Sequence, residues 1–276
     1  MDHHIETPLS FDDMAQGILH SYHTQSDALG PSKIATYLRC PRQYQYQYIE
    51  RIPAPSSPAA ALGSTFHAIV KQARDLHWTP DCAPQAADAL TELWEIVRPE
   101  TSDPKCPKTA KAFREARDTW LPRYLEWSEN HIDIAVEEFF DFEVATDGPA
   151  LRLQGTVDRV YRADGLTVIS DVKTGQNLDG DPDSHLQLSL YSYAYRQLSG
   201  AAEDAVEFYM ARKEKLEDRV IRSRRTQEYL EHVIRDVVTP VAYAIDAGLF
   251  PCNPANKFGC GYCDYQQTCP VGRGVS

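Results

Sequence analysis

The segment from Gly155 to Gly175, GTVDRVYRADGLTVISDVKTG, constrains the fold more than any other part of the chain. Its two halves have the apolar patterning of β-strands, and the Asp164-Gly165 dipeptide between them is favoured in two-residue hairpin turns. If these two residues form the turn, Asp158 lies directly opposite Asp171. Facing side chains of an antiparallel pair project to one side of the sheet, so the sequence predicts two neighbouring carboxylates.

Lys173 follows Asp171 by two residues and is therefore predicted on the same face of the strand. Two facing carboxylates repel each other unless a cation lies between them, and Mg²⁺ prefers carboxylates together with water and phosphate oxygens. A protonated lysine does not bind metal, but it can orient a water or stabilise negative charge on phosphorus. The alternative is that both acids are solvated or paired with nearby arginines. Three such groups on one face favour a site for metal-assisted phosphodiester hydrolysis.

Composition limits the classes of protein that the chain can belong to. The 276 residues carry a formal net charge of −12, which argues against non-specific coating of nucleic acid. There is no apolar run long enough for a membrane span and no signal-peptide pattern, so we expect no membrane association and a cytoplasmic location. Local groups of basic residues could still contact the backbone of a nucleic acid. They are Arg39, Arg42 and the cationic residues between 212 and 225.

Three of the seven cysteines form a C-x2-C-x5-C pattern near the carboxyl end: Cys260, Cys263 and Cys269. Such crowding indicates a metal site rather than disulfides. Four ligands are normal for a closed thiolate site, so a fourth must come from elsewhere. Cys40 is the best candidate and Cys252 its rival. The chemistry of the thiols alone leaves both zinc and an iron–sulfur cluster open.

The order of the expected elements predicts an α/β fold with a central mixed sheet and flanking helices. We expect an N-terminal arm at residues 1–30, followed by a single domain over 31–276. Within that domain, a helical insertion is predicted at about 75–130 and a ligand-bearing tail at about 250–270.

Three segments in this order, GTVDRVY, VISDVKTG and QLSLY, resemble the RecB-type branch of the PD-(D/E)XK nucleases. That pattern has an acid on one strand, D-x-K on the next and Q-x-x-x-Y on a following helix. The resemblance implies catalytic roles for Asp158, Asp171, Lys173, Gln187 and Tyr191. It also implies an upstream helical histidine, which GSTFHAIV supplies as His67. The implied Mg²⁺ or Mn²⁺ ligands are His67, Asp158, Asp171 and the carbonyl of Val172, with Gln187 near the metal or the scissile strand and Tyr191 near the DNA.

The division of the cysteines into one plus three resembles the iron–sulfur nucleases of the RecB and AddB type and the CRISPR-associated RecB-like exonucleases. The resemblance implies a [4Fe–4S] cluster held by Cys40, Cys260, Cys263 and Cys269, which would fasten the N-terminal segment to the tail. The role implied for this cluster is structural.

The function that these resemblances imply is a Mg²⁺- or Mn²⁺-dependent exonuclease that acts on single-stranded DNA or DNA ends. Its expected setting is recombination, repair or CRISPR spacer acquisition, with recombination or CRISPR-adaptation proteins as further partners. Three alternatives stay open at this point. They are a structure-selective or flap endonuclease, a non-catalytic DNA-end-binding subunit of a recombination complex, and a zinc-stabilised scaffold without nuclease activity.

Overall fold

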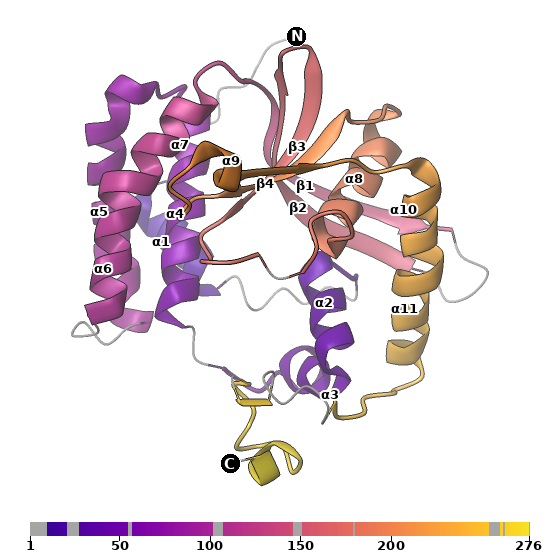
Figure 1. Cartoon of the computed structure of the whole chain (residues 1–276). Helices are drawn as coiled ribbons and strands as arrows, with labels where there is room; N and C mark the ends of the chain where they lie inside the picture. Colours follow the sequence, from indigo (N-terminus) through magenta and orange to yellow (C-terminus); the bar gives the residue numbers. More distant parts are fainter. Residues whose placement is uncertain are drawn as a thin grey trace.

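The computed structural model describes residues 10–20, 28–54, 57–101, 107–145, 151–178, 180–253, 260–261 and 263–275. Its centre is one mixed sheet in the order β1-β2-β3-β4-β5, shown in Figure 1. The strands are β1 (Ile132–Val144), β2 (Leu151–Ala163), β3 (Leu166–Lys173), β4 (Ala205–Met210) and β5 (Val220–Ser223). Among the five strands of this sheet, β3 and β4 pair in parallel and the other neighbours pair antiparallel; helix α8 (Leu186–Ser199) connects β3 and β4. The predicted α/β fold with a mixed sheet is confirmed.

The β2–β3 hairpin has the register that the sequence predicts. Asp164 and Gly165 both have positive φ, at 52° and 77°, as a type I′ turn requires. The pairs run from Ala163 with Leu166 to Arg159 with Ser170. Just beyond the pair of Arg159 with Ser170 lie Asp158 on β2 and Asp171 on β3. Residues that face each other across two paired strands project to the same side of the sheet, so both aspartates lie on one face.

Helices cover the sheet on two sides (Figure 1). The first side is built mainly by α4 (Pro58–Asp75), α5 (Ala83–Thr101), α6 (Pro107–Glu115), η4 (Ala116–Trp120) and α7 (Leu121–Ser128). The second side is built by α2 (Pro31–Arg39), α3 (Pro41–Tyr44), α8, α10 (Gln227–Val233), η5 (Ile234–Val238) and α11 (Thr239–Asp246). A separate apolar core lies under each group. None of the helices in the described part of the chain combines the length and apolarity that a bilayer span requires.

The segment expected to be an N-terminal arm contains a helix, α1 (Phe11–His20). Ala15 of this helix is buried in the same core as residues of α4 and α5, so this part of the arm is docked. Leu29 then forms a β-bridge with Leu153. The arm's residues 1–9 and 21–27 lie outside the described part.

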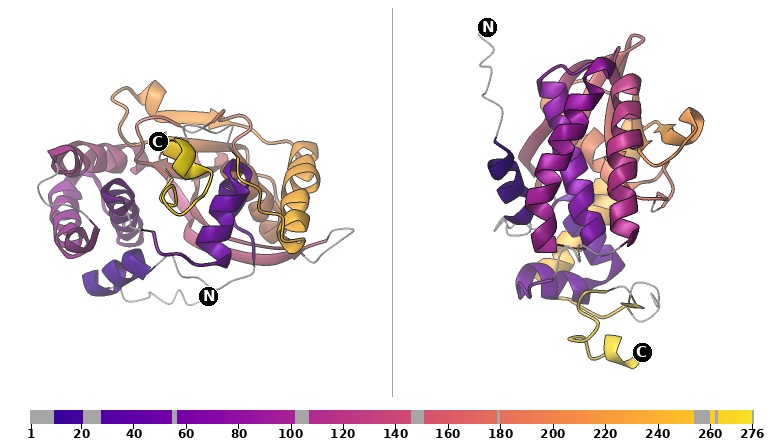
Figure 2. Two further views of the ribbon diagram at one scale, coloured as in Figure 1. Left: turned by 90° about the horizontal axis from the view of Figure 1, so that it is seen from below. Right: turned by 90° about the vertical axis from the view of Figure 1, so that its left-hand side faces the viewer.

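Helices α2 and α3 lie beside the C-terminal tail, as both views in Figure 2 show. The Tyr37 hydroxyl donates to the carbonyl of Leu249 at 2.6 Å, and the Tyr265 hydroxyl donates to the carbonyl of Ile52 at 3.1 Å. Tyr37 belongs to α2, and Ile52 follows the short π-helix η2 (Gln45–Ile49); the tail ends in the 3₁₀-helix η6 (Gly272–Val275). These bonds join segments more than two hundred residues apart in the sequence.

Candidate active site

The two aspartates of the hairpin meet at the carboxyl end of β3. Asp171 is only 1 % exposed, and the Asp158 carboxylate accepts a hydrogen bond from the backbone N–H of Val172 at 3.0 Å. Burial, reinforced by the neighbouring charge of Asp158, raises the pKa of Asp171 to about 7. Apart from the Lys173 ammonium, neither carboxylate oxygen of Asp171 has a hydrogen-bond partner among the described residues. This pair of acids is therefore short of positive charge.

Lys173 links the acids to helix α8. Its Nζ lies 2.6 Å from Asp171 Oδ2 and donates to Gln187 Oε1 at 2.7 Å. Gln187 Nε2 in turn donates to the Tyr191 hydroxyl at 2.8 Å. The structure thus connects Asp171, Lys173, Gln187 and Tyr191 in one polar chain, although two different elements carry them.

Tyr191 lies behind Gln187 and supports it. The side chain is 4 % exposed, and burial raises its pKa well above the ordinary value, which keeps the hydroxyl neutral. The resemblance had implied a place for Tyr191 near DNA. Because the side chain has so little accessible surface, it is better placed to orient Gln187 than to contact DNA.

His67 and Glu137 complete a group that could hold a cation. His67 Nδ1 lies 3.3 Å from Asp158 Oδ2, and ligand atoms of His67, Glu137 and Asp158 all lie within 4.8 Å of one another. Burial and the charge of Asp158 raise the pKa of Glu137 to about 8. A bound divalent cation would favour the ionised form of both raised carboxyl groups, so the donor set fits a hard metal such as Mg²⁺ or Mn²⁺.

This group overlaps the predicted ligand set in two residues, His67 and Asp158. Asp171 lies beside this group, and the Lys173 ammonium contacts the Asp171 carboxylate. Val172 contacts Asp158 through its N–H, and the role of its carbonyl as a ligand stays a prediction.

Glu137 is the site residue that sequence reasoning missed. It follows Val136, which pairs with Arg159, and precedes Glu138, which pairs with Val157. Its position is therefore across from Asp158, and its φ of 49° is a conformation that non-glycine residues rarely adopt. Such strain costs about 1–3 kcal/mol and is concentrated at functional sites. The available signal was the doublet pattern VEEFF, which breaks the alternation of a regular strand.

A family model described as the PD-(D/E)XK nuclease superfamily matches residues 28–270. The chain belongs to this superfamily. Among solved structures, the chain is similar to one titled "Crystal structure of SSO0001", with 14% identity and a TM-score of 0.43. That similarity covers 95% of this chain and 94% of the other. No curated protein matches the chain.

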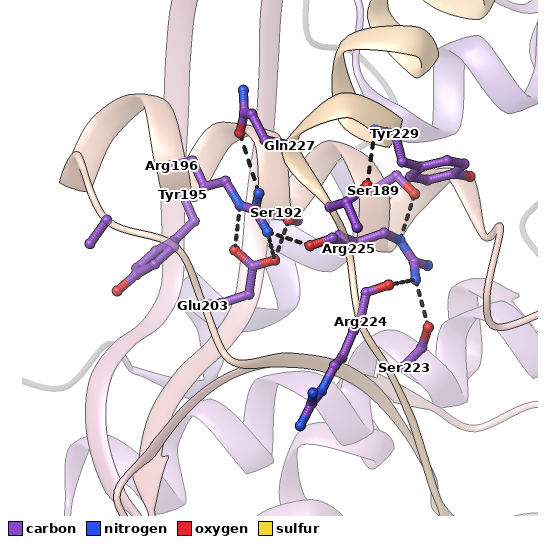
Figure 3. Close-up of polar contacts among 12 residues, drawn as sticks. Ser189, Ser192, Tyr195, Arg196, Glu203, Ser223, Arg224, Arg225, Gln227 and Tyr229 are labelled. Carbon is purple, nitrogen blue, oxygen red and sulfur yellow. Dashed lines mark hydrogen bonds and ion pairs between the residues drawn. The ribbon is translucent and has the colours of Figure 1, made fainter.

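In this PD-(D/E)XK protein, a buried polar network contacts the face of α8 that carries Ser189, Ser192 and Arg196 (Figure 3). The Arg225 guanidinium donates to Ser189 Oγ at 2.9 Å, to Ser223 Oγ at 2.7 Å and to the Pro182 carbonyl at 2.7 Å. Arg225 is 6 % exposed, so this member of the basic cluster between 212 and 225 directs its donors into the protein and has a structural role.

A second arginine extends the network toward the end of α8. Arg196 donates to Glu203 at 2.7 Å and to the carbonyl of Arg225 at 2.7 Å. The Ser192 hydroxyl also donates to Glu203, at 2.5 Å. Together these bonds fix the helix whose opposite face presents Gln187 to Lys173.

Replacing Arg225 with alanine is expected to lower the free energy of unfolding by about 2–4 kcal/mol, because several buried acceptors lose their donor at once. Urea unfolding followed by circular dichroism measures the change. Arg235→Ala is the matched control, since Arg235 is exposed and its ion pair is with its sequence neighbour Asp236. Equal unfolding midpoints for Arg225→Ala and the wild type would show that the network does not stabilise the nuclease fold.

Five thiols line a single cavity between the N-terminal helices and the tail, namely those of Cys40, Cys252, Cys260, Cys263 and Cys269. Burial, with the neighbouring charges of Cys40 and Cys260, raises the pKa of the Cys263 thiol. Cys252 and Cys269 have their sulfur atoms 3.8 Å apart. In the described part of the chain, no three thiols come within 4.8 Å of one another, so they do not converge on a single point.

The cavity nevertheless offers four or more soft donors from two distant segments, which is the donor set that structural zinc or an iron–sulfur cluster uses. Arg42 also lines it and donates to Gln45 at 2.8 Å, so this candidate for a DNA contact faces the cysteines. Cys82 lies apart from this cavity, at the end of η3 (Pro80–Cys82), and Cys106 lies outside the described residues.

Proposed function

We propose that the protein is a metal-dependent deoxyribonuclease of the RecB type that degrades single-stranded DNA from its ends. The observation that carries this proposal is the contact of Lys173 with both Asp171 and Gln187, beside the His67, Glu137 and Asp158 group. An acid pair, a cation-holding group and a lysine within one small volume are what hydrolysis of a phosphodiester needs.

Each residue has a role that its chemistry supports. His67, Glu137, Asp158 and Asp171 would hold Mg²⁺ or Mn²⁺, which when bound polarises the phosphate and lowers the pKa of a coordinated water. Lys173 would position the attacking water or stabilise the charge that develops on the phosphate oxygens. Gln187 holds the Lys173 ammonium in place, and Tyr191 holds Gln187.

For the cysteines we propose a [4Fe–4S] cluster ligated by Cys40, Cys260, Cys263 and Cys269. A tetrahedral zinc site, with Zn–S distances of about 2.3 Å, needs sulfur atoms about 3.8 Å apart. Among the described residues no three thiols lie within 4.8 Å of one another, and this suits a larger group than a single ion. Cys252, whose sulfur does meet the zinc spacing with Cys269, is the alternative fourth ligand.

The preference for DNA ends and the pathway follow from the RecB-type resemblance. Recombination, repair and CRISPR spacer acquisition are the proposed settings, with proteins of those pathways as partners. The net charge of −12 supports a site-focused interaction, because non-specific electrostatic attraction to DNA would be weak. A single nuclease domain over residues 31–276, with the insertion and tail predicted above, is the proposed organisation.

A cleavage assay on end-labelled oligonucleotides tests the proposed function. With Mg²⁺ or Mn²⁺, we expect progressive shortening of single-stranded DNA from one end, and chelation with EDTA should abolish it. Duplex DNA of the same sequence and circular single-stranded DNA serve as controls. Cleavage of the circle would indicate an endonuclease, and binding of linear DNA without cleavage would indicate an end-binding subunit; either result contradicts the proposal.

A further inference from the structure

Some of the basic residues between 212 and 225 form a class whose contacts lie within the protein. Arg219 donates to the carbonyls of Lys213 and Glu214, at 3.1 and 2.6 Å, and Arg222 pairs with the buried Glu207 at 2.9 Å. With Arg225 buried in the α8 network, these three arginines use their donors within the protein. Arg212 does not belong to this class.

Arg212 stacks on an aromatic ring and has no acidic partner. Its guanidinium carbon lies 4.8 Å from the centre of the Trp120 ring, and Trp120 is 3 % exposed. In the described part of the chain no carboxylate lies within ion-pairing distance of Arg212, and its buried Nε has no hydrogen-bond partner. Stacking on tryptophan fixes the plane of the guanidinium while leaving the N–H donors of its two terminal nitrogens available.

The backbone places Arg212 at the same edge of the sheet as the catalytic lysine. Met210 pairs with Lys173 in the parallel β3–β4 ladder, and the Ala211 N–H donates to the Lys173 carbonyl at 2.9 Å. Neighbouring parallel strands have their carboxyl ends at the same edge of the sheet, so the turn that carries Arg212 begins beside the end of β3. Arg219 of α9 (Leu216–Arg219) fixes this turn through its bonds to the carbonyls of Lys213 and Glu214.

We infer that Arg212 binds a backbone phosphate of the substrate strand next to the scissile phosphate, held in orientation by Trp120. The inference rests on the proposed nuclease function and adds a positioning residue to it. A planar, oriented guanidinium suits bidentate contact with phosphate oxygens, and a fixed contact costs little additional entropy when DNA binds. In a protein with this net charge, an arginine without an acidic partner is a favourable place for such a contact.

DNA binding by a non-cleaving variant tests the inference. Fluorescence anisotropy with a labelled oligo-dT is measured in Mg²⁺ for Lys173→Ala alone and with Arg212→Ala or Arg212→Gln added. We expect Kd to rise about tenfold for either addition, and the slope of log Kd against log salt to fall by about 0.7, the value for one lost phosphate contact on a single strand. Arg212→Lys should recover part of the affinity, because it restores the charge without the planar fork.

Arg235→Ala in the same background is the control for loss of one positive charge, and thermal unfolding of every variant controls for the loss of the stack on Trp120. A purely structural role would lower the melting temperature and leave the salt slope unchanged, which would overturn the inference, as would an equal loss of affinity in Arg235→Ala. Cleavage by the wild type is measured separately. If the wild type binds DNA without cleaving it, the proposed function fails, while the salt slopes still decide the role of Arg212.

Discussion

Replacing Lys173 with methionine is expected to slow DNA cleavage by about 10²–10³-fold or more, which is the usual effect of removing one donor that stabilises a developing negative charge. Methionine retains most of the aliphatic length but removes the ammonium that contacts Asp171 and Gln187. Single-turnover rates on end-labelled single-stranded DNA measure the loss, because they report the chemical step rather than product release.

Lys111→Met is the matched control, since Lys111 is an exposed lysine on α6 whose partner is Glu115. It is expected to cleave at the wild-type rate. Circular dichroism and thermal unfolding of both variants test whether the fold persists. If the Lys173→Met protein is folded and cleaves at the wild-type rate, then Lys173 has no part in the mechanism, and its contact with Asp171 is not needed for cleavage.

The sequence predicted the β2–β3 hairpin and its register because the determinants are local. Asp164 and Gly165 tolerate the positive φ values of a tight turn, and such a turn fixes every pair in the ladder that follows. The contact of Lys173 with Gln187 depends on α8 as well. The Q-x-x-x-Y spacing placed Gln187 and Tyr191 on one helix face, but only the family resemblance implied that this face lies against the site, and the contact itself was not predicted.

Glu137 could not be predicted in the same way, because its place in the site depends on a backbone conformation that most strands do not have. The alternation rule assigns strand residues to two faces, and a residue with positive φ departs from that rule. Its neighbour Glu138 has the same side-chain chemistry, so composition alone does not distinguish the two.

The arginines show a second limit of sequence reasoning. Arg212, Arg222 and Arg225 are equivalent as charges, but their roles depend on partners brought in by distant elements. Arg222 finds the buried Glu207 on β4, whereas Arg225 finds Ser189 on α8. Since burial and pairing decide whether an arginine can contact DNA, a basic cluster in a sequence predicts only the candidates.

Replacing Cys40 with serine is expected to have the largest effect on stability of any single change discussed. The proposed cluster would link residue 40 to residues 260–269 and so close a loop of more than two hundred residues. By analogy with a covalent cross-link, closing a loop of that size contributes about 5 kcal/mol through the entropy of the unfolded chain. Absorbance near 400 nm, iron per chain and the unfolding midpoint of anaerobically purified protein measure the outcome; all three should fall.

Cys252→Ser separates the two candidate fourth ligands. Cys252 lines the same cavity and lies 3.8 Å from Cys269, so its removal perturbs the same surroundings without removing a proposed ligand. We expect this variant to retain its iron and its unfolding midpoint.

If Cys252→Ser loses the iron and Cys40→Ser keeps it, then the tail and the residues just before it form the site by themselves. The link to the N-terminal helices would in that case depend on the hydrogen bonds of Tyr37 and Tyr265 rather than on a metal group. A protein that contains zinc and no iron in both variants would instead favour the tetrahedral thiolate site, for which Cys252 and Cys269 already have the required spacing.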